Sequence, residues 1–249
     1  MNLKYTLSGF IYISPEDDCQ ATVNAMLATG YSGDFCIADS FCPEFTARLM
    51  EAGFLVMSMN LNEGGGEPFY ISLPKLHLVR SALYFENLHI KKSIRRFLTP
   101  SLGYELKADA DFDLIIDRCV EKHGSDWLTP PLVECIKIIR QNAVKNHPCL
   151  STLRAQLSAP VFSYPASFAL YRSGKLVAGE FGVICGKVYT SYSGFYDEDN
   201  AGTLQIIYTT RYLQEHGFTF FDMGMPLEYK TELGAVNITP DEFIQLFRL

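Results

Sequence analysis

The chain has 249 residues, of which 48% are hydrophobic and 20% are charged, and its formal net charge is -7. These proportions are ordinary for a folded globular protein and exclude a globally disordered chain. The acidic balance disfavours a protein that tracks nucleic-acid phosphates over a broad surface, but it leaves room for a local basic patch.

The cysteines and histidines indicate neither a disulfide framework nor a metal site. The cysteines form no CxxC pair, and the histidines have no metal-ligand spacing. We therefore expect free thiols in a reducing, cytoplasmic compartment, and neither a metal nor another cofactor. No apolar run approaches the roughly 18 residues that span a bilayer, so no membrane partner is expected. The cysteines are Cys19, Cys36, Cys42, Cys119, Cys135, Cys149 and Cys185.

The N-terminal third predicts alternating strands and helices. Ser14, Pro15 and Asp17 form a capping pattern that predicts the start of a helix, and Gly30 can end that helix. The three glycines at 64–66 are followed by no G-K-[ST] and predict a flexible turn. Strands are predicted at Tyr5–Ile13, Phe35–Ala38 and Phe54–Met59, with a helix at Pro43–Ala52.

The middle of the chain predicts helices and then a long irregular segment. Leu88–Leu98 is basic and amphipathic, Phe112–Lys122 and Pro131–Asn142 have helical periodicity, and Trp127 lies between those two helices. The segment from Val144 to Ala166 contains Pro148, Pro160 and Pro165 and no long periodic pattern, which predicts a loop-rich insertion.

The C-terminal part predicts an antiparallel meander followed by a helix and one more strand. The predicted elements are strands at Phe168–Arg172, Leu176–Ile184 and Val188–Ser193, a helix at Leu204–Glu215, a strand at Phe218–Phe221 and a helix at Asp241–Leu246. This order is typical of a GNAT-like acyltransferase core. We expect an α/β (α+β) fold in which helices flank an antiparallel-rich mixed sheet in residues 87–249, preceded by a smaller α/β region in residues 1–86.

Several segments, taken in order, carry a resemblance to one family. They are Gly33-Asp34, Arg48–Phe54 (RLMEAGF), Leu88–Phe97 (LHIKKSIRRF), Phe112–Cys119 with Trp127-Leu128, Leu176–Gly182 (LVAGEFG), Phe220–Asp222 (FFD) and Glu232–Ala235 (ELGA). Together they resemble the leucyl/phenylalanyl-tRNA–protein transferases, which share the GNAT-like core. The resemblance implies transfer of an aminoacyl group from charged tRNA to a protein N-terminal amine, which marks that protein for degradation. It implies aminoacyl-tRNA and a protein or peptide N-terminus as partners, and we favour a monomer.

Lys91, Lys92, Arg95 and Arg96 form a candidate tRNA-binding cluster. On a helix, residues three and four apart are neighbours, so these like charges would repel one another unless an anion relieved them. Contacts from Lys and Arg to phosphates carry much of the affinity for nucleic acids. The alternative is a solvated surface.

Two further candidates are an aromatic ring and a carboxylate. Trp127 can stack on the terminal adenine of tRNA, a contact of roughly 1–3 kcal/mol per base, and the alternative is core filling. Asp222 ends an apolar strand and matches a family residue that helps to handle the acceptor amine, so it is a candidate catalytic residue. The alternative is a turn contact with Gly224.

Three positions depart from the family pattern. Tyr192 stands where the family has Glu, and Gly224 where it has Gln, which places family chemistry at both positions in doubt. We keep Tyr192 as a candidate catalytic residue and Gly224, with Phe195, among the candidate substrate-binding residues. Glu180 replaces a large apolar residue of the aminoacyl pocket, which predicts a preference for a basic or polar group; the alternative is a surface side chain.

Two other functions stay open. A non-catalytic protein that binds tRNA ends or peptide N-termini would fit the two changed positions. An acyl-CoA-dependent N-acyltransferase needs a pyrophosphate loop, whereas the equivalent stretch, Gly194–Gly202, has three acidic residues and no Lys or Arg.

Overall fold

The computed structural model describes residues 2–62, 64–146 and 162–249. Its N-terminal part is built from two small antiparallel pairs and two helices. The pairs are β1 (Lys4–Tyr5) with β2 (Ile11–Tyr12) and β3 (Leu55–Asn60) with β4 (Tyr70–Lys75); the helices are α1 (Cys19–Thr29) and α2 (Pro43–Glu51). α1 ends at Gly30, whose left-handed φ of 62° suits glycine, as the sequence predicted.

A seven-stranded mixed sheet forms the centre of the molecule, in the order β11-β5-β10-β9-β8-β7-β6. Its strands are β5 (Arg80–Leu83), β6 (Tyr104–Ala108), β7 (Ser163–Arg172), β8 (Lys175–Cys185), β9 (Val188–Tyr196), β10 (Phe220–Asp222) and β11 (Val236–Ile238). The predicted meander is β7-β8-β9, and the predicted helix is α7 (Ala201–Glu215), which returns the chain to β10 parallel to β9. The chain is therefore a mixed α/β protein with a mostly antiparallel sheet.

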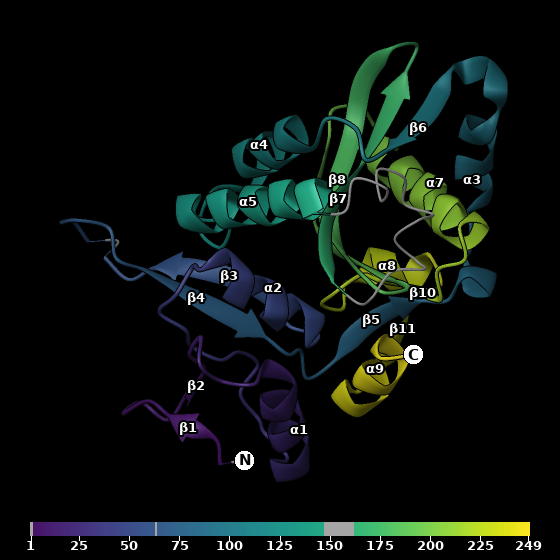
Figure 1. Ribbon diagram of the computed structural model, residues 1–249. Coiled ribbons are helices and arrows are strands. Elements are labelled where there is room, and N and C mark those ends of the chain that lie inside the picture. The colour runs from purple at the N-terminus through teal and green to yellow at the C-terminus, as the bar shows by residue number, and fades with distance from the viewer. Residues whose placement is uncertain (1, 63, 147–161) are drawn as a thin grey trace.

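Helices cover both faces of this sheet. Figure 1 shows α4 (Phe112–His123) and α5 (Pro130–Asn146) on one side of β7 and β8, and α7 on the other. β8 is buried on both faces, so its sequence is nearly continuous in apolar residues: Phe181 packs in the core under α4 and Ala178 in the core under α7. The other α-helices in the described residues are α3 (Lys92–Arg95), α8 (Glu228–Glu232) and α9 (Pro240–Phe247).

Three predicted boundaries were wrong. Tyr5–Ile13 is a hairpin rather than one strand, because the chain turns at Gly9, which has a φ of 82°. Asp18, not Ser14, caps α1; the Ser14 amide instead donates to Asp17 in the preceding turn. The end of the predicted insertion is also not a loop, since β7 begins at Ser163. Residues 147–161 of that insertion, including Cys149, lie outside the described residues.

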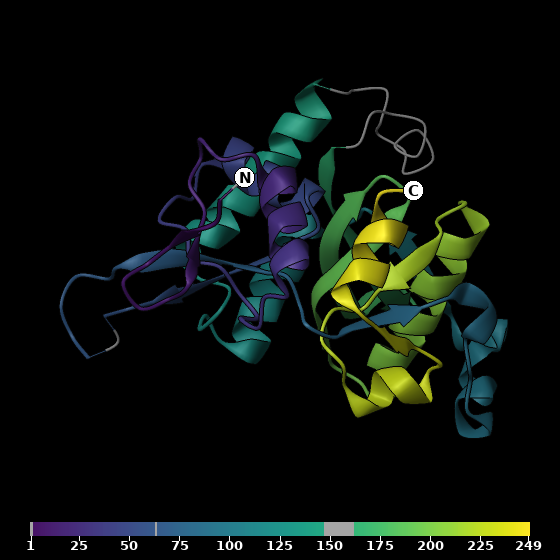
Figure 2. The ribbon, with the colours of Figure 1, turned by 90° about the horizontal axis from the view of Figure 1, so that it is seen from below.

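The basic segment is not the continuous helix that its spacing suggested. α3 covers only Lys92–Arg95, and it is followed by a 3-10 turn at Arg96–Leu98. Lys91 is the non-helical residue before α3, so the predicted side-by-side stacking of Lys91 with Arg95 does not apply. Figure 2 shows α3 at the right-hand edge of the molecule, away from the purple helix α1.

The sequence also led to predictions about the domain boundary, the cysteines and membrane spans. β5 precedes the predicted domain boundary at residues 86/87, yet it pairs with β10 and β11 within the central sheet; the division into two regions stays a prediction. Of the cysteines that the structure describes, each is free, and only Cys42 is exposed. No helix in the described ranges is long and apolar enough to cross a membrane.

Candidate functional site

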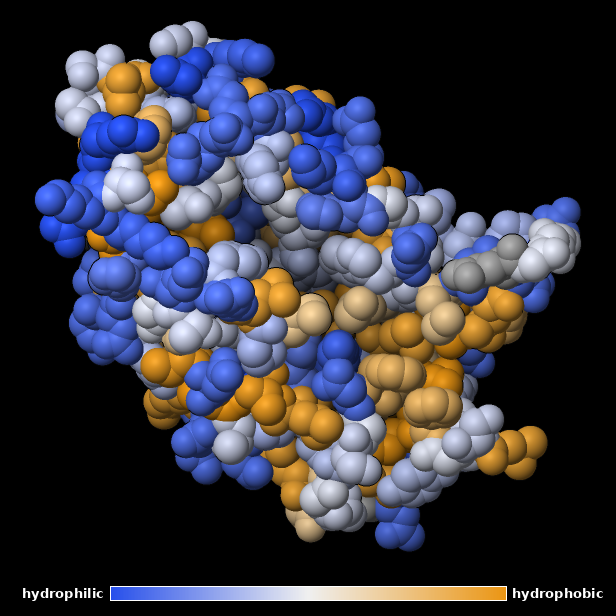
Figure 3. Space-filling model, turned by 180° about the vertical axis from the view of Figure 1, so that it is seen from behind, coloured by the Kyte–Doolittle hydropathy of each residue, from blue (hydrophilic) through white to orange (hydrophobic). Residues whose placement is uncertain are grey.

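A cavity of about 840 Å³ lies between the β3–β4 hairpin and the C-terminal part of the sheet. Its wall is built by β3, β4, the loop before α5, β8, β9, the N-terminal end of α7, the loop after β10 and α8. In Figure 3 the face opposite to that of Figure 1 is hollowed near its centre. The volume falls in the range of roughly 300–1,000 Å³ that is common for ligand pockets, so this cavity is the candidate site.

The cavity opens where two parallel strands separate. β10 pairs with β9 only from Val188 to Thr190, whereas β9 continues to Tyr196. The chain after β10 stays beside β5 instead: the Met223 amide donates to Ser81, and the Ser81 amide donates to the Gly224 carbonyl at 2.7 Å. Ligands of α/β proteins commonly bind at the carboxyl ends of strands in such a gap.

A β-bulge places Tyr192 in the wall. Phe181 of β8 is opposite Ser193, but the next residue, Gly182, is opposite Ser191, so Tyr192 is the extra residue of β9. At Gly182 a Cβ would lie 2.1 Å from the carbonyl oxygen of Thr190, so only glycine fits the bulge. The Tyr192 hydroxyl accepts a hydrogen bond from the Val56 amide at 3.2 Å, and burial raises the pKa of Tyr192 well above its usual value.

Asp222 lies next to the cavity but does not line it. It is fully buried, and its carboxylate accepts hydrogen bonds from Arg80 Nε at 3.0 Å, Thr190 Oγ1 at 2.8 Å and the Gly224 amide at 3.0 Å. Arg80 also donates to the carbonyl of Gly53 at 2.8 Å. The turn contact with Gly224 that the sequence left as an alternative is therefore present, and Asp222 fixes the loop that borders the cavity.

Glu180 is buried in the cavity wall, so the surface alternative was wrong. Only 4% of it is exposed, and its Oε2 accepts a hydrogen bond from Ser191 Oγ at 2.9 Å. Its Oε1 is buried and has no hydrogen-bond partner among the described residues. Burial raises the pKa of Glu180 to about 7, against the opposing effect of polar neighbours such as Gln205.

Lys230 of α8 is a cavity residue that the sequence did not single out. It is 6% exposed, and its Nζ donates to the carbonyl of Met223 at 2.5 Å and to that of Met225 at 2.8 Å. Burial lowers its pKa to about 8, although the charges of Asp222 and Glu180 oppose this. α8 has five residues and no distinctive pattern, so only the tertiary structure brings Lys230 to the site.

The remaining predicted substrate-binding residues also reach the cavity. Trp127 is half-buried, and its carbonyl accepts from the Ser58 amide at 3.0 Å, which anchors the loop before α5. Phe195 lines the cavity with its ring under the guanidinium of Arg118, 4.6 Å from the ring centroid. Gly224 has a φ of 69°, so a side chain there would be strained, although a Cβ would make only an ordinary contact, 3.5 Å from Leu55 Cδ1.

The basic cluster does not line the cavity, but it contacts an element that does. Lys91, Lys92, Arg95 and Arg96 are exposed. Lys91 Nζ lies 2.7 Å from the carboxylate of Glu232, at the end of α8, and the His89 amide donates to the Leu233 carbonyl. The cluster is thus tied to the helix that carries Lys230 into the site.

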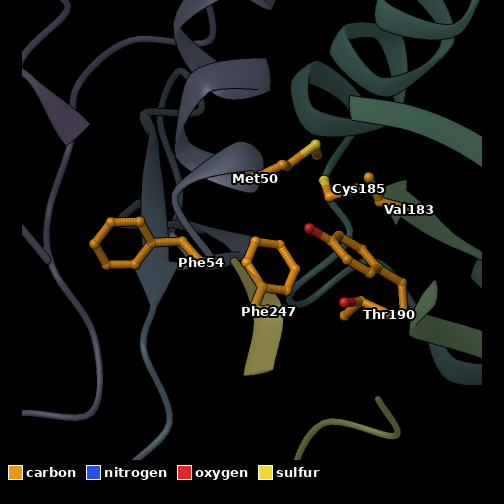
Figure 4. A pocket seen from close by; sticks show the side chains of 8 residues that line it. Met50, Phe54, Val183, Cys185, Thr190 and Phe247 are labelled. Atoms are coloured by element: carbon orange, nitrogen blue, oxygen red, sulfur yellow. The ribbon is translucent and has the colours of Figure 1, made fainter. Parts of the chain in front are cut away.

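A second cavity, of about 10 Å³, lies on the other side of Tyr192. Figure 4 shows Met50 of α2, Cys185 of β8 and Phe247 of α9 around it. This volume is about the minimum for one water molecule, so it is a packing gap rather than a ligand site.

These features define a mixed α/β protein with a ligand cavity at a fork between parallel strands, with a buried acid and a buried amine in its wall. A family model described as "Leucyl/phenylalanyl-tRNA protein transferase" matches residues 82–248, and the chain therefore belongs to that family.

Curated relatives named leucyl/phenylalanyl-tRNA–protein transferase come from several bacteria. The protein of Hahella chejuensis is 25% identical over 68% of this chain and 65% of its own length. That of Chromobacterium violaceum is 26% identical over 72% and 68%, and that of Rubrobacter xylanophilus is 24% identical over 82% and 91%. The chain thus matches about two thirds of the first two relatives.

Solved structures with similar arrangements are more distant. One titled "Crystal structure of FemX" has a TM-score of 0.44 and 11% identity, covering 100% of this chain and 84% of that one. The C-terminal domain of a putative lysylphosphatidylglycerol synthetase from Agrobacterium fabrum has a TM-score of 0.38 and 13% identity, covering 90% and 70%.

Proposed function

We propose that this protein transfers an aminoacyl group from aminoacyl-tRNA to the amino group at the N-terminus of a protein. Family membership supports the reaction class. One observation supports assigning the reaction to the cavity: the family match from residue 82 to 248 includes the whole fork of β9 and β10 and the buried groups Glu180 and Lys230. A protein modified in this way would be marked for degradation.

The reaction needs positioning and proton management rather than a cofactor. The neutral amine of the acceptor attacks the ester carbonyl carbon, so a C–N bond forms and the bond from that carbon to the ribose 3′-oxygen breaks. The amine loses one proton, and the leaving 3′-oxygen gains one. An enzyme accelerates this by holding both reactants in contact and by stabilising the charge that develops on oxygen.

We assign the polar residues at the fork two kinds of role. Asp222 is a positioning residue, because its carboxylate holds Arg80 and the Gly224 amide and thereby fixes the loop at the cavity. The Tyr192 hydroxyl, which accepts from the Val56 amide, still has its own proton to donate to an oxygen of the reacting ester. Tyr192 thereby supplies the polar contact at the position where the family has Glu.

The tRNA would reach the cavity along α8. The exposed cluster Lys91, Lys92, Arg95 and Arg96 can contact phosphates of the acceptor end, and Trp127 in the cavity wall can stack on the terminal adenine. The ion pair of Lys91 with Glu232 joins the cluster to α8, the helix that carries Lys230 in the cavity wall.

The test is a transfer assay with radiolabelled aminoacyl-tRNAs and peptides that differ in their N-terminal residue. We expect label to pass to a peptide, and we expect Tyr192→Phe to slow the step by roughly 100-fold, a typical effect of losing one donor to a developing oxyanion. Lys187→Glu is a control, since Lys187 is exposed at the opposite end of β9. Retention of tRNA on a filter without transfer from any donor would make the protein a binding protein instead.

A further inference from the structure

One part of the cavity wall is polar, and it does not offer the apolar surface that an apolar side chain would need. Glu180 of β8, Ser191 of β9 and Gln205 of α7 line it together. Ser191 already donates to Oε2 of Glu180 at 2.9 Å, and the Gln205 Nε2 donates to Thr209 at 2.9 Å. Oε1 of Glu180, buried in the same wall, has no hydrogen bond of normal geometry among the described residues, although the side chains of Gln205 and Thr209 lie close enough to lower the pKa of Glu180.

The buried amine in the cavity does not neutralise this carboxylate by contact. Lys230 Nζ donates to the carbonyls of Met223 and Met225 and acts on Glu180 through its charge, without a direct ion pair to it among the described residues. A carboxylate that is 4% exposed and has one unpaired oxygen is costly unless a ligand supplies a donor. The pKa of Glu180, raised to about 7 by burial, reflects that cost.

The chemistry of the ligand follows from the unsatisfied acceptor atom, Oε1 of Glu180. A leucyl or phenylalanyl side chain would cover Oε1 and give it no hydrogen bond, whereas an ammonium or guanidinium group would form a charge-assisted hydrogen bond with it. The alkyl stem of such a side chain can pack on aromatic rings in the wall, of which Phe195 and Tyr229 are two. Resting on the proposed transferase function, we infer that the donor carries a cationic amino acid, lysyl or arginyl, whose charged end binds Glu180.

The first experiment compares donors. Label transfer to one peptide is measured from tRNAs charged with lysine, arginine, leucine or phenylalanine, for the wild type and for Glu180→Gln, Glu180→Met and a control, Glu215→Gln, at an exposed carboxylate of α7. We expect the wild type and the control to favour lysine or arginine. We expect Glu180→Gln to lose about 30-fold or more of that transfer, as when one partner of a buried charge pair is removed, and Glu180→Met to gain transfer of leucine. Transfer of leucine or phenylalanine alone by the wild type would overturn the inference and leave the proposed function intact.

A second experiment needs no catalysis. Adenosines that carry lysine or leucine through a 3′-amide bond cannot transfer their amino acid, and both have the same α-amine, so calorimetric titration isolates the side chain. The inference is supported if the lysyl compound binds tenfold or more tighter than the leucyl compound, and if Glu180→Gln, but not Glu215→Gln, abolishes this difference. It is then supported even if no transfer occurs in the first assay, because a lack of transfer contradicts only the proposed function. Equal binding of the two compounds would overturn the inference.

Discussion

At the scale of single residues, the site depends on three buried ionisable groups that are satisfied to different extents. Asp222 has three donors, Lys230 has two carbonyl acceptors, and Glu180 has one donor for two oxygens. Because a buried charge is costly unless it is paired, the least satisfied group is the one that most needs a ligand, whereas the fully paired one contributes to the framework.

The pair of Arg80 and Asp222 should therefore govern stability. Arg80→Met keeps much of the packing on the Phe243 ring, 3.8 Å from the guanidinium, but leaves Asp222 without its cation. We expect a loss of about 3–5 kcal/mol in the free energy of unfolding, measured with urea. Adding Asp222→Leu should recover part of this loss because no unpaired charge then remains. A double variant as unstable as the sum of both single variants would contradict this account.

Glu180 should give the protein a characteristic pH dependence. Its pKa is about 7 when folded and about 4.5 when unfolded, so the folded state binds more protons between these values and stability falls as pH rises through them. Below pH 4.5 the penalty is absent, and above pH 7 it is complete, on the order of 3 kcal/mol. Glu180→Gln removes it, so the variant should gain stability over the wild type across this window.

Lys230 does not obscure that measurement. Its pKa is lowered to about 8, so it is charged in both the folded and the unfolded state throughout the lower window. It adds a slope of the opposite sign only between its folded and unfolded pKa values, where stability should rise with pH. A stability difference between Glu180→Gln and the wild type that stays constant from pH 4.5 to 7 would show that Glu180 is not held in a costly environment.

At the scale of elements, the sequence correctly predicted features that depend on neighbouring residues, such as helix ends and tight turns. Gly30 ends α1, and the Ser173-Gly174 turn joins β7 to β8 with positive φ at both residues, as a two-residue hairpin requires. The prediction of one strand at Tyr5–Ile13 was wrong because the strand-favouring composition of the segment was given more weight than the turn signal of Gly9. β5 was missed because it gains its partners, β10 and β11, from more than a hundred residues away.

The residues of the site also differ in whether the sequence could predict them. Motif order and residue type indicated Trp127, Glu180 and Tyr192, which line the cavity. Sequence spacing could not place Lys230, which reaches the cavity through a short helix, nor could it separate Asp222 in the framework from the wall residues. The basic cluster was assigned to a regular helix, but the helix is one turn long, and its ion pair with α8 depends on tertiary structure.

The bulge in β9 is the element on which the position of Tyr192 depends. Gly182→Ala would place a methyl group 2.1 Å from the Thr190 carbonyl, so the strands must shift. We expect a loss of about 1–3 kcal/mol in stability and, because Tyr192 moves with the strand, a fall in transfer of up to about 100-fold. Gly33→Ala is the control, since its nearest atom would lie 3.9 Å from the new Cβ. Unchanged transfer in a stable Gly182→Ala protein would argue that Tyr192 has no part in the reaction.

At the scale of the whole molecule, one part of the surface is basic although the net charge is negative. The net charge is -7, yet four exposed cations lie together at an edge of the molecule away from α1, on a segment that contacts α8. An acidic surface repels nucleic acid in general, whereas a local basic cluster that contacts α8 attracts it at one place. Under the proposed function, such an arrangement would favour a tRNA that approaches with its acceptor end directed to the cavity over one that binds elsewhere.

This arrangement predicts a salt dependence that belongs to the cluster. The double variant Lys92→Glu/Arg96→Glu leaves the ion pair of Lys91 intact and changes two exposed side chains, so folding should be unaffected. If each residue contacts one phosphate, the slope of log K for tRNA binding against log salt should become shallower by about 1.4–1.8, from roughly 0.7–0.9 per contact. The Lys187→Glu variant carries a charge reversal at an exposed position of the β8–β9 turn and should keep the wild-type slope. Equal slopes for all three proteins would place the tRNA on another face, because phosphate contacts that do not exist cannot be lost, and the path along α8 would then have to be abandoned.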